Sequence, residues 1–189
     1  MIEYLKNIDR EVFLFLNSLH ADWLDPIMMF VTSFWFWYPV VILFIILSIK
    51  YYKKNFWIPL IFAILCFTLT DLGSNFTKKG VQRYRPSHNV EIAEDVHIVD
   101  NYTGGKYGFF SGHAANGFGL AFITLLFIRK RYYTVIVLLW AALVSYSRIY
   151  VGVHYPGDIL VGAIFGTVMA FLVYNLFKSI PFFYRKLYP

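Results

Sequence analysis

The segment from Ser147 to Asp158 places an arginine, a histidine and an aspartate between two long apolar runs of the sequence. His154 and Asp158 are four residues apart, so one helical turn, or a turn that enters a helix, would bring the imidazole and the carboxylate together. A carboxylate behind an imidazole fixes its tautomer and stabilises the imidazolium that forms while the other ring nitrogen reacts. Taken alone, these residues are equally compatible with a loop in which Arg148 and Asp158 form a surface ion pair. The rest of the chain favours the chemical interpretation.

The composition indicates one membrane-embedded helical domain that covers residues 1–189. Of the 189 residues, 59% are hydrophobic and only 15% are charged. Charged residues usually make up about a quarter of a soluble protein, so this chain has too few to cover a soluble globule. The single cysteine, Cys66, excludes an intramolecular disulfide. The net charge of +6 lies in short basic clusters between apolar segments, which suits lipid headgroups and not nucleic acid.

Five apolar segments predict an all-α, integral-membrane bundle of about five transmembrane helices. They cover residues 26–49, 56–70, 114–128, 132–147 and 158–177. We expect the second helix to continue through Asp71, Asn75 and Lys78, which share one face turned to the protein interior or a water-filled cavity. Pro39 should kink the first helix, and Asp158 should cap the start of the fifth. Gly162 and Gly166, four residues apart, predict close packing of the fifth helix against a neighbour. The polar segment 79–110 is long for a loop, which predicts a functional role.

The N-terminal residues 1–20 predict an amphipathic helix that is too polar to span a membrane. Its apolar residues recur at spacings of three and four, with charged residues between them. Such a helix lies in the membrane interface or packs on the surface of its own protein, and the two placements are compatible.

Counting the spans gives a topology. Residues 50–55, 129–131 and the C-terminal tail share one side, which holds nine of the seventeen Lys and Arg residues and none of the eleven Asp and Glu residues. The positive-inside rule makes that side cytoplasmic. Loops 79–110 and 149–157 then share the extracytoplasmic side of a bacterial-type cytoplasmic membrane. Seven polar residues can therefore meet at that membrane face: Lys78, Arg85, Ser111, His113, Arg148, His154 and Asp158.

Phosphate is the ligand that best explains such a group. Arginine offers bidentate hydrogen bonds to phosphate oxygens and lysine adds a point charge. Ser111 and Gly112 stand at a helix start, where free backbone amides bind anions. His154 could attack phosphorus, while His113 could protonate the leaving oxygen and later activate water. No thiolate cluster, HExxH motif or acidic pair with metal-ligand spacing occurs, so we expect neither a metal nor another cofactor.

Three segments of the chain resemble the signature of the PAP2 phosphatase superfamily, written KxxxxxxRP, PSGH and SRxxxxxHxxxD. The corresponding residues here run from Lys78 to Pro86, from Phe110 to His113 and from Ser147 to Asp158. Their order and spacing also match, and the spans resemble the membrane branch that dephosphorylates lipid phosphates. The resemblance covers roughly residues 25 to 177. One position departs from the signature, since Phe110 stands where the family has proline.

The resemblance implies a role for each matching residue. His154 would be the nucleophile, Asp158 its partner and His113 the general acid and base. The phosphoryl group would be held by Lys78, Arg85, Ser111, Gly112 and Arg148. Lys79 and Arg83 are additional cations that could contact the second phosphate of a diphosphate, although lipid headgroups or the acidic residues of the same loop explain them better. Tyr102 and Tyr107 could line the mouth of the site.

We therefore expect a metal-independent lipid phosphatase that acts outside the cytoplasmic membrane through a phosphohistidine. The resemblance suggests undecaprenyl diphosphate, phosphatidylglycerol phosphate, phosphatidate or lipid A phosphate as substrate. A phosphotransferase that passes the phosphoryl group to another lipid is an alternative, as is a non-catalytic lipid-binding protein in which His154 would be dispensable. A vanadium haloperoxidase is disfavoured because those relatives are soluble. The sequence leaves the oligomeric state open.

Overall fold

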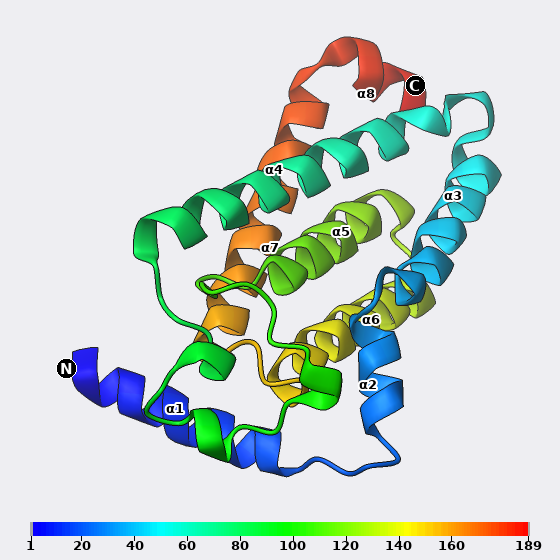
Figure 1. The fold of residues 1–189 in the computed structure, drawn as a ribbon. Helices are drawn as coiled ribbons and strands as arrows, with labels where there is room; N and C mark the ends of the chain where they lie inside the picture. The colour runs from blue at the N-terminus through cyan, green and yellow to red at the C-terminus, as the bar shows by residue number, and fades with distance from the viewer. Residues whose placement is uncertain (1, 189) are drawn as a thin grey trace.

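The computed structural model describes residues 2–188, and this part of the chain is almost entirely helical (Figure 1). The helices are α1 (Ile2–Ser18), α2 (Asp25–Thr32), α3 (Tyr38–Tyr52), α4 (Trp57–Val81), α5 (Gly112–Ile128), α6 (Arg131–Tyr150), α7 (Pro156–Ser179) and α8 (Pro181–Leu187). Five short 3-10 turns lie between them: Phe34–Phe36, Lys53–Asn55, Pro86–His88, Ala93–Asp95 and Val99–Asn101. The expected all-α fold is confirmed.

Helices α3 to α7 form a bundle in which α5 is the central element, packed against α4, α6 and α7. Within residues 2–188, four segments are long and apolar enough to cross a membrane, namely Phe34–Asn55, Trp57–Val81, Arg131–Tyr150 and Pro156–Ser179. The apolar α5 is shorter, at 17 residues. Most residues of α5 are buried, because α4, α6 and α7 pack around it. Together they are the five expected apolar helices.

The first expected span, residues 26–49, is two helices and not one kinked helix. Helix α2 ends at Thr32, and the backbone is extended at Ser33 before a short turn leads into α3. Pro39 lies in the first turn of α3, where a missing N–H costs no intrahelical hydrogen bond. The proline therefore starts a helix instead of kinking one, and the span comprises residues Phe34–Asn55.

The predicted small-residue face brings α7 close to α5. A Cβ atom on Gly166 would lie 2.1 Å from the carbonyl oxygen of Ala115, and one on Gly162 would lie 2.6 Å from that of Ser111. No side chain larger than hydrogen fits at either position, which lets the two backbones approach each other. This contact holds the start of α5 beside the start of α7, where two of the three sequence motifs end.

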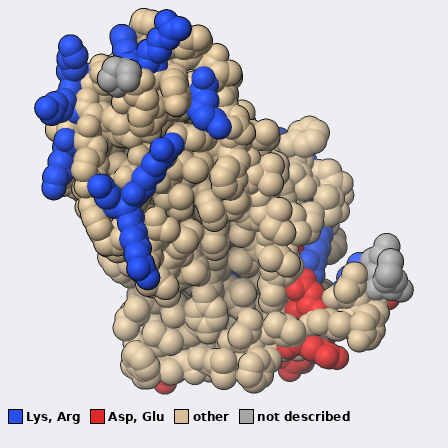
Figure 2. Space-filling view, turned by 180° about the vertical axis from the view of Figure 1, so that it is seen from behind, with Lys and Arg blue, Asp and Glu red and all other residues tan. Residues whose placement is uncertain are grey.

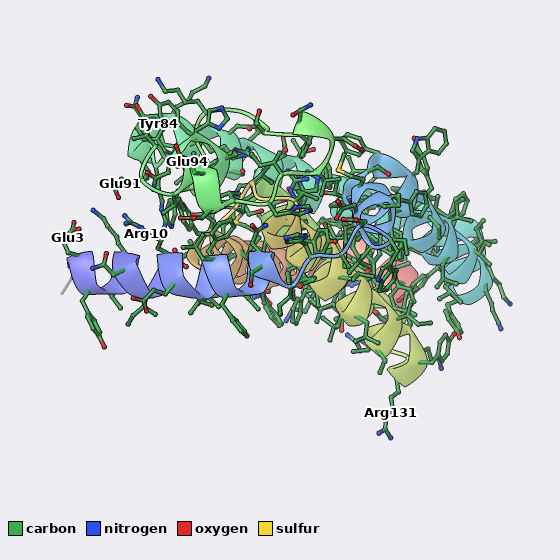
Figure 3. All side chains as sticks on the ribbon, turned by 60° about the horizontal axis from the view of Figure 1, so that its bottom comes forward. Glu3, Arg10, Tyr84, Glu91, Glu94 and Arg131 are labelled. Atoms are coloured by element: carbon green, nitrogen blue, oxygen red, sulfur yellow. The ribbon has the colours of Figure 1, made fainter. Side chains whose placement is uncertain are left out.

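Helix α1 crosses the end of the bundle beneath the long loop between α4 and α5 (Figures 1 and 3). Its inward face buries Phe13, which packs edge-on against Tyr155, and Asn17, which bonds to backbone groups of His97, Ile149 and Tyr150. Its outward face exposes the apolar residues Tyr4, Leu5, Ile8, Val12 and Phe15, and Leu19 directly after the helix is also exposed. The amphipathic helix is confirmed, and its apolar row is free to meet lipid while the opposite face packs on the protein.

The charges separate along the bundle. Figure 2 shows Lys and Arg side chains gathered toward the α8 end, whereas Asp and Glu lie near the opposite end. The cations of the first end are Lys50, Lys53, Lys54, Arg129, Lys130, Arg131, Lys178, Arg185 and Lys186. The predicted orientation, with the α8 end in the cytoplasm, requires these basic residues to lie at one end of the bundle. The orientation itself stays a prediction.

Candidate active site

A cavity of about 430 Å³ lies at the α1 end of the bundle, beneath the loop between α4 and α5. Six of the residues that the sequence predicts for the site line this cavity: Lys78, Arg85, Gly112, His113, Arg148 and His154. Ser111 and Asp158 lie behind its wall and are fully buried. The structure thus brings together residues that are up to 80 positions apart in the sequence.

The carboxylate of Asp158 orients the imidazole of His154. His154 Nδ1 lies 3.4 Å from Asp158 Oδ2, and both side chains are buried. The same oxygen accepts the N–H of Tyr155 at 3.1 Å, because α7 begins at Pro156 and Asp158 is its third residue. The expected N-cap role of Asp158 is therefore wrong, since Tyr155 holds that position. With Nδ1 donating to Asp158, the lone pair of neutral His154 is on Nε2.

Asp158 is held from its other side by an ion-pair chain that reaches α1. Arg83 Nη1 donates to Asp158 Oδ1 at 2.9 Å, and Arg83 Nη2 donates to Asp9 Oδ2 at 2.8 Å. Asp9 Oδ1 in turn accepts the N–H of Gly157 at 2.7 Å. The Arg83 guanidinium also lies over the ring of Tyr155, 4.0 Å from its centroid. Asp9, Arg83, Asp158 and His154 thus form one connected series.

Neither of the two additional cations lines the cavity. Arg83 forms ion pairs with Asp9 and Asp158 and does not line the cavity, and Lys79 is exposed at the end of α4. The structure therefore offers no contact between these side chains and a second phosphate in this cavity. Asp9 was not predicted from the sequence, because an acid on the polar face of an amphipathic helix carries no signal of such a contact.

Three cations face the cavity without an acidic partner. Among residues 2–188, no carboxylate oxygen lies within 4.0 Å of the side-chain nitrogens of Lys78, Arg85 or Arg148. Arg85 Nε donates to the Tyr107 carbonyl at 3.2 Å, but its buried Nη1 has no hydrogen-bond partner. Burial and the neighbouring Arg148 lower the pKa of Arg85 to about 10. Unpaired buried cations are costly, so the cavity is built for an anion.

Two of the three side-chain nitrogens of Arg148 have hydrogen-bond partners, and the third has none. Its Nη2 donates to the hydroxyl of Tyr102 at 3.0 Å and its Nη1 donates to Thr32 Oγ1, whereas the buried Nε has no partner. Tyr102 lines the cavity as expected, while Tyr107 contributes its carbonyl oxygen to Arg85. Thr32 was not predicted from the sequence, because it lies in an apolar run that carries no motif.

The start of α5 supplies the backbone part of the anion site. Ser111 is the N-cap, and its Oγ accepts the N–H of Ala114 at 3.4 Å. A Cβ atom on Gly112 would lie 3.3 Å from Lys78 Nζ, so the ammonium group sits at the positive end of the helix dipole. Phe110, which replaces the family's proline, is buried and packs on Phe165 with 4.8 Å between ring centroids. This packing holds Phe110, the residue before the N-cap, in the place of the family's proline.

His113 projects from the first turn of α5 into the same cavity. Its Nε2 lies 3.2 Å from the carbonyl oxygen of Thr32. A carbonyl only accepts, so Nε2 carries a proton and Nδ1 is the nitrogen that can exchange one. Thr32 therefore contacts both His113 and Arg148.

The electrostatic surroundings keep His154 neutral. Burial and the nearby cations Arg85, Arg148, Lys78 and Arg83 hold the pKa of His154 well below its usual value. A neutral imidazole whose Nε2 lone pair faces an anion site can act as a nucleophile toward phosphorus. The arrangement can therefore bind a phosphoryl group, attack it and protonate a leaving oxygen.

Comparison with known proteins identifies the family. A sequence model of the PAP2 superfamily matches residues 57–181. The chain is 38% identical to the lipid A 4′-phosphatase of Bacteroides thetaiotaomicron, over 92% of this chain and 79% of that protein. It is 36% identical to the lipid A 4′-phosphatase of Porphyromonas gingivalis, over 93% of this chain and 75% of that protein.

A solved structure supports the fold. The transmembrane PAP2 type phosphatidylglycerolphosphate phosphatase from Bacillus subtilis superposes with a TM-score of 0.75 at 22% identity, covering 94% of this chain and 88% of that one. The three sequence motifs meet in one cavity at the end of a bundle of this fold. The chain belongs to the PAP2 superfamily and is a multi-pass membrane phosphatase of the PAP2 type.

Proposed function

We propose that the protein hydrolyses a phosphate monoester of a membrane lipid at the outer face of the cytoplasmic membrane, through a phosphohistidine on His154 and without a metal ion. The observation that carries this proposal is the set of three cations without acidic partners, Lys78, Arg85 and Arg148, which line one cavity with His113 and His154. A phosphoryl group supplies the missing negative charge and places phosphorus beside both histidines.

In the first step, Nε2 of His154 attacks phosphorus. An N–P bond forms and the P–O bond to the lipid breaks. His113 enters this step as an imidazolium, with a proton on each ring nitrogen beside the bound phosphate, and gives its Nδ1 proton to the departing oxygen, which leaves as an alcohol. Asp158 stabilises the positive charge that develops on the ring of His154. The side chains of Lys78, Arg85 and Arg148, which line the cavity, are the donors for the phosphoryl oxygens.

In the second step, His113 takes a proton from water as the water oxygen attacks the phosphohistidine. The N–P bond breaks, its electrons return to Nε2 of His154, and inorganic phosphate leaves. The groups around the phosphoryl position are guanidinium, ammonium and helix-start amides, which stabilise its charge directly. Among residues 2–188, no group of three or more His, Cys, Asp or Glu side chains is placed to hold a metal ion. These features support a metal-independent reaction.

An apolar groove supports a lipid as the substrate. It has a volume of about 400 Å³, runs between α3, α4 and α5, and shares Phe34, Trp37 and Phe67 with the catalytic cavity. A lipid with its phosphate at His154 could leave its chains in this groove at membrane depth. The two lipid A 4′-phosphatases similar to this chain favour a lipid A phosphate over undecaprenyl diphosphate and phosphatidylglycerol phosphate.

The test is phosphate release by the purified protein from a panel of these lipid phosphates, with and without EDTA. We expect release from the lipid A phosphate and no loss of activity in EDTA. Inactivation by EDTA that Mg²⁺ or Zn²⁺ reverses would overturn the metal-independent mechanism. Substrate labelled in the phosphate separates the alternatives, because a phosphotransferase yields a newly phosphorylated lipid and a non-catalytic binding protein yields no product.

A further inference from the structure

A second polar cluster lines the catalytic cavity, and the proposed reaction does not use it. Asp71 of α4 and Asn116 of α5 both face the cavity. Asn116 Nδ2 donates to Asp71 Oδ1 at 3.2 Å, and Asn116 Oδ1 accepts the hydroxyl of the buried Thr70 at 2.7 Å. Asn75 donates to the other oxygen of Asp71 at 2.9 Å. These bonds fix a carboxylate and a carboxamide in the wall of a membrane-embedded cavity.

The position of this cluster relates it to the substrate. Asp71 is one helical turn from Phe67, which borders both the cavity and the apolar groove. Along α4 it is seven residues from Lys78, or roughly 10 Å at the rise of an α-helix. Asn116 is one turn below His113 on α5. The cluster therefore lies between the phosphate site and the groove, on the side of the cavity from which His113 projects.

The charge of Asp71 is unusual for an anion-binding cavity. No Lys, Arg or His nitrogen among residues 2–188 lies within 4.0 Å of its carboxylate. A partly buried carboxylate is stable there only with enough hydrogen-bond donors. Asn116 and Asn75 provide one donor each, and each carboxylate oxygen can accept a further bond. A second anion placed beside this carboxylate would be repelled.

We propose that Asp71 and Asn116 form the leaving-group subsite and that this subsite selects a sugar phosphate over a diphosphate. The inference rests on the proposed function, because His113 marks the leaving-group side of the phosphorus only if it is the general acid. A hexosamine leaving group presents hydroxyl and amide N–H donors beside the phosphoester, and these can bind the free lone pairs of Asp71. Asn116 keeps the carboxylate in place.

The same subsite should disfavour two other classes of lipid phosphate, the polyprenyl diphosphates and the phosphatidates. In a polyprenyl diphosphate, attack on the terminal phosphorus leaves the inner phosphate next to the Asp71 carboxylate, where like charges repel. In phosphatidate, the leaving diacylglycerol carries esters and offers Asp71 no donor apart from the departing oxygen. Asp71 therefore contributes affinity only for a leaving group that is rich in hydrogen-bond donors.

The experiment compares kcat/KM of purified wild type, Asp71→Asn and Asp71→Glu on bisphosphorylated lipid A, phosphatidate and undecaprenyl diphosphate. Asp71→Asn should lower kcat/KM for lipid A about ten- to hundredfold, the typical effect of losing a hydrogen bond to a charged group. The same variant should raise kcat/KM for the diphosphate and leave phosphatidate nearly unchanged. Asp71→Glu keeps the charge and should keep the discrimination against the diphosphate. Asp22→Asn removes an exposed carboxylate outside the cavity and should change nothing.

Vanadate binding separates a change in the leaving-group subsite from damage to the phosphate site. Vanadate should bind wild type and Asp71→Asn with the same Kd, because the variant leaves the phosphate site intact. A fall by the same factor on all three lipids, or an unchanged ratio between lipid A and the diphosphate, would overturn the subsite. If Asp71→Asn does not fold, Asp71→Glu provides the test. Loss of its preference for lipid A over the diphosphate would then overturn the subsite. If wild type releases phosphate from none of the three lipids, the proposed function fails first and the subsite fails with it.

Discussion

His113 and His154 line one cavity, yet their surroundings give them different tasks. His154 is buried, donates to Asp158 and stands among four cations, whereas His113 is half-buried and donates to a backbone carbonyl. The first environment favours a neutral nucleophile. The second leaves Nδ1 of His113 free to pass a proton to and from the leaving oxygen or water. The two assignments are proposals, and they can be separated by experiment.

Replacing each histidine should separate the two chemical steps. His154→Ala should abolish both turnover and any phosphoenzyme. His113→Ala should be nearly inactive on an alkyl phosphate but should recover the first step with a nitrophenyl phosphate, whose leaving group departs without a proton. Because water then lacks its base, an acid-labile phosphoenzyme should accumulate, measured by trapping labelled phosphate on the protein. Phosphoenzyme in His154→Ala but none in His113→Ala would reverse the two roles.

Because the pKa of His154 is lowered, the acid limb of the pH–activity profile should lie at low pH. The unprotonated imidazole is the nucleophile, so activity is lost only as pH falls through the lowered pKa, well below 6.5. Arg85→Gln removes one of the cations that lower this pKa, so the midpoint of the acid limb should move upward while the rate also falls. The measurement is kcat/KM against pH for both proteins on one substrate. The ionisation of the substrate phosphate affects wild type and Arg85→Gln equally. An identical midpoint of the acid limb in the two proteins would therefore contradict a role for Arg85 in lowering the pKa of His154.

At the scale of elements, α1 contributes contacts to the candidate site in addition to exposing an apolar row. Through Asp9 it holds Arg83, which binds Asp158, and it also binds the first turn of α7 at Gly157. Arg10 of the same helix forms an ion pair with Glu91 of the loop that covers the cavity, and Figure 3 shows the two side chains facing each other. The helix therefore contacts both the ion-pair chain that ends at Asp158 and the loop that covers the cavity.

Asp9→Asn should lower kcat about tenfold with little change in KM, because Asp9 positions Asp158 through Arg83 and does not touch substrate. The expected size is that of one hydrogen bond to a charged group. Glu3→Gln is the matched control, since it breaks an exposed ion pair with Lys6 on the same helix, and exposed pairs contribute little. A lower midpoint of thermal unfolding with an unchanged kcat would mean that Asp9 serves stability alone. Asp9→Glu should restore part of kcat.

The sequence predicted the elements that carry local signals. The spacing of Gly162 and Gly166, the helix start at Ser111 and Gly112 and the apolar periodicity of α1 are properties of neighbouring residues, and each corresponds to a feature of the fold. The break at Ser33 was missed because an uncharged run around Pro39 fits a kinked helix as well as a helix start.

The contacts that complete the site could not be predicted in the same way. Thr32 reaches His113 through its backbone carbonyl, which every residue possesses. Asp9 contacts a loop and a helix start that follow it by 74 and 148 positions. Such contacts depend on how the helices pack, and no local pattern in one sequence encodes that packing. The motif residues were predictable because their chemistry restricts the residue type at each position.

For the whole molecule, the two ends of the bundle differ in charge, and only one of them carries the candidate site. The α8 end carries the basic clusters, while the opposite end carries the cavity, helix α1 and its exposed apolar row (Figures 1 and 2). Cationic loops are retained on the cytoplasmic side of a membrane. This separation supports a catalytic cavity outside the cytoplasm, with α1 lying along the outer surface of the bilayer.

Cysteine labelling in intact cells tests this orientation. The background is Cys66→Ser, which removes the only native thiol, itself fully buried. Val90 is 91% exposed in the loop that covers the cavity, so Val90→Cys should react with an impermeant thiol reagent added outside. Lys130→Cys, at the exposed basic turn before α6, should react only after the membrane is permeabilised. Phosphatase activity must persist in both variants, since neither position lines the cavity. The reverse labelling pattern would place the catalytic cavity in the cytoplasm and would exclude a phosphatase acting at the outer face.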